Sequence, residues 1–192
     1  TPLDYGAVSY EDVQIYTEDG IMLSGWYVPA AEPQGAVVVV LHGSGGDRRG
    51  GAWQAAQLIQ TGYGVLLYDQ RGLGESTGDT VYVGWMAGRD LLAVLDFLAG
   101  RPEVRPERIG VVGLSGGAHI ALNAAYLEPE RFPALWLDGL QAQRIEDFPK
   151  AETLGERFAT LINATILGMT ELHFGRPAPP AFVEMLAGID QT

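Results

Sequence analysis

The sequence predicts an α/β fold built on a mostly parallel β-sheet with helices on both faces. Over residues 36–137, apolar runs of strand length alternate with segments whose apolar residues recur at helical spacing. Strands and helices in alternation place crossover helices on both faces of a parallel sheet. Two shorter apolar runs nearer the N-terminus predict an antiparallel hairpin at one side of that sheet.

The elements follow in a simple order. The hairpin is expected at residues 13–16 and 23–27, joined by a turn in which Gly20 takes the position that favours positive φ. Strands are then expected at 36–41, 64–68, 109–112 and 134–137, and helices at 52–60, 86–99, 118–127, 151–168 and 181–186. The helix at 151–168 carries an apolar stripe of Leu154, Phe158, Leu161, Ile162 and Ile166.

The most informative motif is the pentapeptide Gly113-Leu114-Ser115-Gly116-Gly117, which lies between a predicted strand and a predicted helix. It matches the G-x-S-x-G pattern, in which a serine occupies a strained turn and small flanking residues let strand and helix approach closely. A helix N-terminus beneath the serine offers free N–H groups to an oxyanion. The pattern therefore predicts an acyl-transfer site with Ser115 as the nucleophile.

Two glycine turns upstream support this interpretation. His42-Gly43-Ser44-Gly45-Gly46 follows the first parallel strand, and Asp69-Gln70-Arg71-Gly72-Leu73-Gly74-Glu75-Ser76 follows the next. With the three motifs in this order, the chain resembles the α/β-hydrolase superfamily over nearly its whole length. The resemblance implies a three-layer fold and an oxyanion hole formed by the main-chain N–H groups of Ser44 and Gly116.

The same resemblance implies a helical cap after the sixth strand, over residues 140–180, with Phe148, Phe158 and Leu161 lining an acyl or alcohol pocket. Ordinary packing against the sheet is the alternative for these three side chains. Residues 1–192 are expected to form one domain that lacks the C-terminal part of the superfamily fold, where the catalytic acid and histidine follow strands seven and eight. That would leave the sixth strand as an open apolar edge, to be completed by a missing segment or a second chain.

The catalytic base and acid are hard to place in this chain. The resemblance implies that His42 shapes the glycine loop. His119 is expected to pack within its helix, and His173, after the nucleophile, to belong to the cap or face solvent. A role as the catalytic base is the less favoured alternative for each of the three. Asp138, at the end of the sixth strand, is a possible acid, although an ordinary strand-end role is favoured. Asp69 and Arg71 are expected to hold their turn together.

Composition excludes several classes of protein. The net charge of -12 is spread along the chain, which disfavours nucleic acids and anionic membranes as partners. The absence of cysteine removes disulfides, thiolate metal sites and a cysteine nucleophile, and no histidine pair has ligand spacing, so no metal or other cofactor is expected. No apolar run is long enough to span a membrane, so a soluble domain is expected. The first residue is Thr1, which leaves open whether an upstream segment precedes it.

Three functions compete at this point. The first is a serine hydrolase acting on a carboxylic ester or related small acyl substrate. The second is a catalytically incomplete hydrolase fragment, or a non-catalytic interaction module, that needs another segment for activity. The third, a nucleotide-binding domain, fails because Thr77 and Arg48 stand where a dinucleotide fingerprint requires its third glycine.

Overall fold

The computed structural model describes residues 1–79, 87–140, 142, 144–174 and 179–189. The chain divides into two compact units, Thr1–Leu140 and Gln141–Thr192, here called the sheet unit and the helical unit. Each is described by itself.

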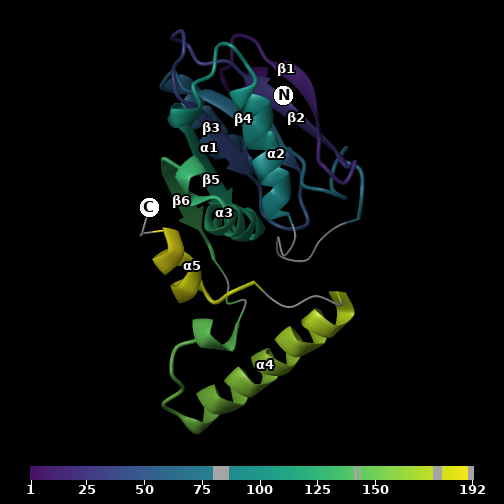
Figure 1. Ribbon diagram of the computed structural model, residues 1–192, viewed down its shortest axis with the longest axis vertical. Helices are drawn as coiled ribbons and strands as arrows, with labels where there is room; N and C mark the ends of the chain where they lie inside the picture. Colours follow the sequence, from purple (N-terminus) through teal and green to yellow (C-terminus); the bar gives the residue numbers. More distant parts are fainter. Residues whose placement is uncertain (80–86, 141, 143, 175–178, 190–192) are drawn as a thin grey trace. The chain divides into compact units, whose positions relative to one another are not determined.

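The sheet unit is built on a mixed β-sheet with strand order β1-β2-β4-β3-β5-β6 (Figure 1). Its strands β4, β3, β5 and β6 are parallel, whereas β1–β2 and β2–β4 are antiparallel. This confirms the predicted hairpin and parallel sheet. The strand bounds are β1 Glu11–Tyr16, β2 Met22–Val28, β3 Val37–Leu41, β4 Gly64–Tyr68, β5 Ile109–Leu114 and β6 Ala134–Asp138.

Helices cover both faces of this sheet because the central strands are apolar on both sides. All five residues of β3 are buried. Alternate residues belong to different cores: Val37, Val39 and Leu41 pack with α2 (Gly88–Ala99) and α3 (Gly116–Leu127), whereas Val38 and Val40 pack with α1 (Ala52–Gln60). The predicted three-layer α/β architecture is thereby confirmed.

The strand ends determine where a site can form. Leu41 pairs with Gly113 across β3 and β5, so the loops after these two parallel strands leave the same edge of the sheet side by side. The chain passes from β3 to β4 on one side and later to β5 on the other. In open α/β sheets, such a reversal of strand order at the carboxyl edge opens a ligand crevice.

Most of the predicted helix bounds differ by a few residues from the observed ones; α3, for example, begins at Gly116 rather than at residue 118. In the described residues the second helix begins at Gly88, and Met86, at its predicted start, lies outside them. In the helical unit, α4 covers Leu154–Phe174 rather than 151–168. Its start is shifted by a capping box: Thr153 Oγ accepts the N–H of Glu156, and the Glu156 carboxylate accepts the N–H of Thr153.

The helical unit also contains α5 (Phe182–Ile189), close to its predicted place. Four residues of the predicted apolar stripe on α4 are exposed, namely Leu154, Phe158, Leu161 and Ile162. The side chain of Ile166 lies outside the described part of the chain. No described helix combines the length and apolar character that a membrane crossing takes.

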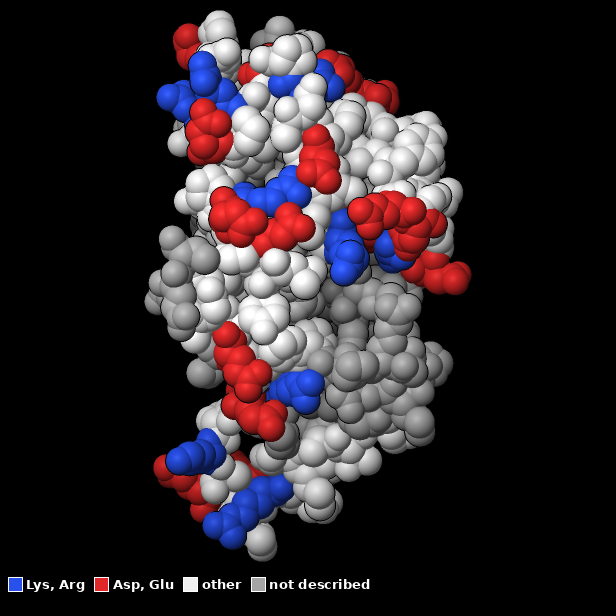
Figure 2. Space-filling model, viewed as in Figure 1, with Lys and Arg blue, Asp and Glu red and all other residues white. Residues whose placement is uncertain are grey.

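Charged side chains of both signs lie next to each other on the face shown in Figure 2. Ion pairs such as Arg101 with Glu11 and Arg131 with Asp96 join distant segments of the sheet unit. Pairing of this kind agrees with a net negative charge that is distributed rather than gathered in one tract.

Candidate active site

Ser115 lies at the turn between β5 and α3, as predicted from the glycine pattern. Its φ of 49° and ψ of −113° are a strained conformation for a residue with a side chain. The flanking glycines allow this turn. A Cβ on Gly113 would lie 2.6 Å from the Cα of Ala118, and a Cβ on Gly117 would lie 2.6 Å from the carbonyl oxygens of both Leu41 and His42. Larger residues would push the strand and helix apart.

The loop after β3 lies directly against this turn. A Cβ on Gly43 would be 3.5 Å from the Cβ of Ser115, and a Cβ on Gly116 would be only 3.0 Å from the main-chain nitrogen of Ser44. The structure therefore brings together the three residues that the sequence singled out, Ser115, Ser44 and Gly116. Gly116 is also the first residue of α3, where main-chain N–H groups lack helical partners.

His42 is completely buried and both of its ring nitrogens are engaged. Nδ1 lies 2.7 Å from the carbonyl oxygen of Gly43, and Nε2 accepts the main-chain N–H of Gln70 at 3.2 Å. Because Nε2 is an acceptor, the proton of the neutral ring is on Nδ1, which donates to Gly43. Burial lowers the pKa of His42 and so favours this neutral form. The structure supports the predicted loop-shaping role.

Neither of the other two histidines has a described position that identifies it as the general base. His119 is buried in α3, only 1% exposed, in line with packing within its helix. His173 belongs to α4, and its side chain lies outside what the structure describes.

Asp138 reaches the candidate site through its main chain. Its carbonyl oxygen accepts the N–H of Ser115 at 2.7 Å, and the side chain itself is exposed. The next residue, Gly139, has a φ of 76°, which turns the chain away from β6 beside Ser115. This hydrogen bond uses a main-chain carbonyl that any residue at position 138 could supply, so the carboxylate of Asp138 stays a possible acid.

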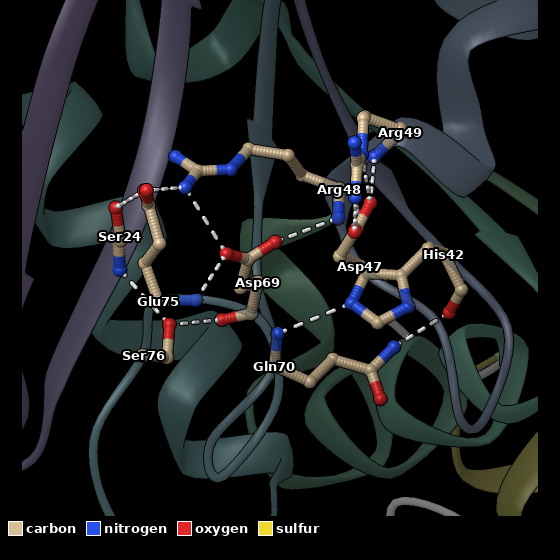
Figure 3. A network of polar contacts seen from close by, with 9 residues as sticks. All are labelled: Ser24, His42, Asp47, Arg48, Arg49, Asp69, Gln70, Glu75 and Ser76. Atoms are coloured by element: carbon tan, nitrogen blue, oxygen red, sulfur yellow. Dashed lines mark hydrogen bonds and ion pairs between the residues drawn. The ribbon is translucent and has the colours of Figure 1, made fainter.

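The turn after β4 is held by Asp69, as expected (Figure 3). This buried carboxylate accepts the main-chain N–H of Arg48 at 2.7 Å and that of Glu75 at 2.8 Å, and it pairs with the Arg48 guanidinium at 3.1 Å. Gly74 is required because a Cβ there would lie 2.1 Å from the carboxylate. Ser76 completes the turn by donating its hydroxyl to the Asp69 carbonyl at 2.6 Å.

Arg71, the second predicted brace of this turn, pairs with residues of two other segments. Its Nε donates to the buried Asp90 at the start of α2 at 2.6 Å, and Nη1 donates to Asp19 in the hairpin turn at 3.0 Å. One guanidinium thus connects three segments that are distant in sequence. A separate exposed pair, Asp47 with Arg49, follows the glycine loop, and the Arg49 hydrogen bond lowers the pKa of Asp47 to about 2.

Sequence reasoning missed Gln70 and Arg48 as parts of this site. Gln70 donates both its main-chain N–H and its side-chain amide to His42, and Arg48 lies over the ring of Trp26, with its Cζ 4.7 Å from the ring centroid. Both residues are polar, in turns, and would be expected at the surface. The sequence signal that could have identified them is their position: Gln70 lies in the turn after β4, and Arg48 lies just after the glycine loop.

Within residues 1–79, 87–140, 142, 144–174 and 179–189, no three His, Asp or Glu side chains are grouped so that they could hold a metal ion.

A strained serine between a parallel strand and a helix, beside a glycine loop at the carboxyl edge of the sheet, defines the class as an α/β hydrolase. Comparison with known families agrees. Residues 32–160 match the family described as serine aminopeptidase, S33, and the chain belongs to this family of α/β hydrolases.

Individual proteins are also similar to this chain. The uncharacterized Mycobacterium tuberculosis protein Rv2307c is 39% identical over 119 residues, which cover 62% of this chain and 42% of the relative. The chain thus spans about two fifths of the length of that curated relative. Among solved structures, the Pyrococcus furiosus esterase Pf2001 is 27% identical with a TM-score of 0.71, covering 98% of this chain and 69% of the esterase chain. An acetyl xylan esterase from Paenibacillus is 31% identical with a TM-score of 0.56, covering 66% and 47%.

Proposed function

We propose that the protein is a serine hydrolase that cleaves carboxylic esters or related small acyl substrates. The observation that carries the proposal is the placement of Ser115, in a strained turn at the N-terminus of α3, beside the main-chain nitrogen of Ser44. Esterases among the structural relatives favour an ester over other acyl groups.

In the proposed reaction, Ser115 Oγ attacks the substrate carbonyl while its proton passes to a general base. The N–H groups of Ser44 and Gly116 stabilise the oxyanion of the tetrahedral intermediate, helped by the positive end of the α3 dipole. The leaving alcohol takes up a proton as the intermediate collapses to an acyl-serine, and water then releases the carboxylic acid. No described residue is assigned as the base, so the proposal covers the nucleophile and the oxyanion hole.

The expected cap at residues 140–180 also remains a proposal. The exposed apolar stripe on α4 gives it the kind of surface that an acyl chain would contact. Its role would be to select among esters rather than to take part in bond cleavage.

A fluorophosphonate probe tests the nucleophile directly, because it phosphonylates a serine that is activated and flanked by oxyanion donors. We expect labelling at Ser115, identified by peptide mass spectrometry, and its loss in Ser115→Ala. The exposed Ser9 offers a matched control, and Ser9→Ala should label like the parent chain. Undiminished labelling of Ser115→Ala would refute the assignment.

The second candidate, a hydrolase fold that is inactive without a further segment, is favoured by one observation. His42 uses both ring nitrogens within the loop, and His119 is buried in α3. This candidate predicts no ester turnover by the 192 residues alone. Turnover that appears when a polypeptide carrying the remaining strands is added would show that the site needs another segment; turnover without it would reject this candidate.

A further inference from the structure

The loop that carries the Ser44 N–H is held by a small polar group that the proposed reaction does not itself use. His42 and Gln70 are both more than nine-tenths buried, and two hydrogen bonds join them. They come from different strands, since His42 follows β3 and Gln70 follows β4. Three successive contacts connect these two residues to the Ser44 N–H.

The first step sets the histidine tautomer. The main-chain N–H of Gln70 donates to Nε2 of His42, so the ring proton of the neutral imidazole must be on Nδ1. That proton is donated to the carbonyl oxygen of Gly43 at 2.7 Å. The direction in which the imidazole donates is thus determined by the main-chain N–H of a residue in the turn after β4.

The second step follows from peptide geometry. The Gly43 carbonyl and the Ser44 N–H belong to one planar trans peptide, in which C=O and N–H point in opposite directions. When His42 holds the carbonyl oxygen, the Ser44 N–H is held pointing the other way. The Ser44 nitrogen lies against Gly116, which contributes the second proposed donor.

The third step concerns the start of the same loop, where the main chain of His42 is held in place. The side-chain amide of Gln70 donates to the carbonyl oxygen of His42 at 2.5 Å. That oxygen lies in turn against Gly117, where a Cβ would be 2.6 Å away. The His42 carbonyl is therefore confined between the Gln70 amide on one side and the first turn of α3 on the other.

We propose that Gln70 is a positioning residue: through His42, it sets the direction of the Ser44 N–H and its distance from the elbow helix that bears Ser115. This inference rests on the proposed function for its catalytic consequence. Its structural content, the direction and rigidity of one N–H group, stands on the contacts alone. An oxyanion donor contributes most when it needs no reorganisation during the reaction. By holding His42, Gln70 keeps the Ser44 N–H in a fixed direction before the substrate arrives.

Substitutions separate hydrogen bonding from packing. Gln70→Met keeps the side-chain volume and the main-chain N–H that donates to Nε2, and it removes only the side-chain amide that donates to the His42 carbonyl, so it tests the third step. If the side chain only packs, this variant should behave like the parent. At position 42, an asparagine amide can replace the Nδ1–H donor, whereas a glutamine amide lies nearer the place of Nε2. We therefore expect His42→Asn to retain more function than His42→Gln. Leu98→Ala, in the buried face of α2, is a control for lost stability without a change at the site.

Two readouts are taken on the whole chain of 192 residues. With p-nitrophenyl acetate or, if turnover is absent, the rate of fluorophosphonate labelling, Gln70→Met should lower kcat or the labelling rate by about 10- to 100-fold, with KM nearly unchanged. By NMR, the ¹⁵N order parameter of Ser44 should fall in Gln70→Met and in His42→Gln and stay at the parent value in Leu98→Ala.

The two readouts distinguish the two possible failures. A parent chain that is neither labelled nor active would count against the proposed function, and the Ser44 order parameter would still test the positioning role. An unchanged Ser44 order parameter and an unchanged rate in Gln70→Met would overturn the inference, even if Ser115 is the nucleophile.

Discussion

Ser115 donates its main-chain N–H to the carbonyl oxygen of Asp138 at 2.7 Å, so the end of β6 holds the strained turn that presents the serine hydroxyl. The contact uses the main chain of Asp138, and its carboxylate is exposed to solvent. Any residue at position 138 could make this contact, so it holds the turn independently of the side chain.

Asp138→Asn should therefore change little. The substitution keeps the carbonyl and the strand, so we expect labelling of Ser115 and any ester turnover to stay within about threefold of the parent, as for a surface residue away from the chemistry. A triad acid behaves differently, since replacing it by the amide lowers kcat by about 10⁴-fold in the serine protease template. A loss of that size would assign Asp138 as the acid.

Asp69→Ala should destabilise the sheet unit strongly. The substitution leaves the buried Arg48 guanidinium without its buried partner and two main-chain N–H groups without acceptors. Breaking a buried ion pair on one side costs about 3–5 kcal/mol. The free energy of unfolding from urea titration would measure this. Asp12→Ala, at an exposed aspartate, should stay within about 0.5 kcal/mol of the parent, and equal effects at the two sites would contradict the role of Asp69.

Two glycines in helices should respond in opposite ways to alanine. At Gly117, a Cβ would lie 2.6 Å from two main-chain carbonyl oxygens, which cannot move aside, so we expect a loss of at least about 1–3 kcal/mol in stability. At Gly155, in the first turn of α4, a Cβ meets nothing within 4 Å. Gly155→Ala should therefore stabilise α4 by up to about 1 kcal/mol through helix propensity. Circular dichroism during thermal unfolding would compare the two.

His42 should make stability depend on pH. Burial lowers its pKa in the folded protein below the ordinary value of 6.5, so at mildly acidic pH the unfolded chain binds a proton that the folded chain does not. The contribution of His42 to stability is therefore complete above about pH 6.5 and falls as the pH drops, by at most about 1.4 kcal/mol per pH unit. Urea titrations of the parent and of His42→Asn at about pH 7 and pH 5 would measure it. Parallel curves for the two proteins would contradict the burial argument.

Phe158→Ser tests the proposed cap. This side chain is 65% exposed on α4, so its replacement should leave the free energy of unfolding within about 0.5 kcal/mol of the parent. If the segment selects acyl chains, the ratio of kcat/KM for a long-chain ester to that for acetate should fall, because apolar contact area is lost. An unchanged ratio would favour the alternative of ordinary packing. Glu184→Ser, at an exposed position on α5, is the control.

Local sequence patterns determined most of the fold. The run of β3 is apolar on both faces, which identifies a central parallel strand, and α1 was predicted with its observed bounds because its apolar spacing and flanking residues are regular. The start of α4 was predicted three residues early, although Thr153 and Glu156 form a capping box that is legible in the sequence. The glycines around Ser115 likewise reveal the turn, because only small residues permit it.

Only the tertiary structure determined which polar groups are in contact. Ser44 and Gly116 are 72 residues apart, and their contact depends on the pairing of Leu41 with Gly113 across two parallel strands. His42 and Gln70 are joined in the same way, by strands that lie side by side in the sheet. Hydrophobic periodicity tells which faces are buried but carries no information on which buried donor finds which acceptor. That pairing is determined by strand order and register, which arise only when the sheet forms.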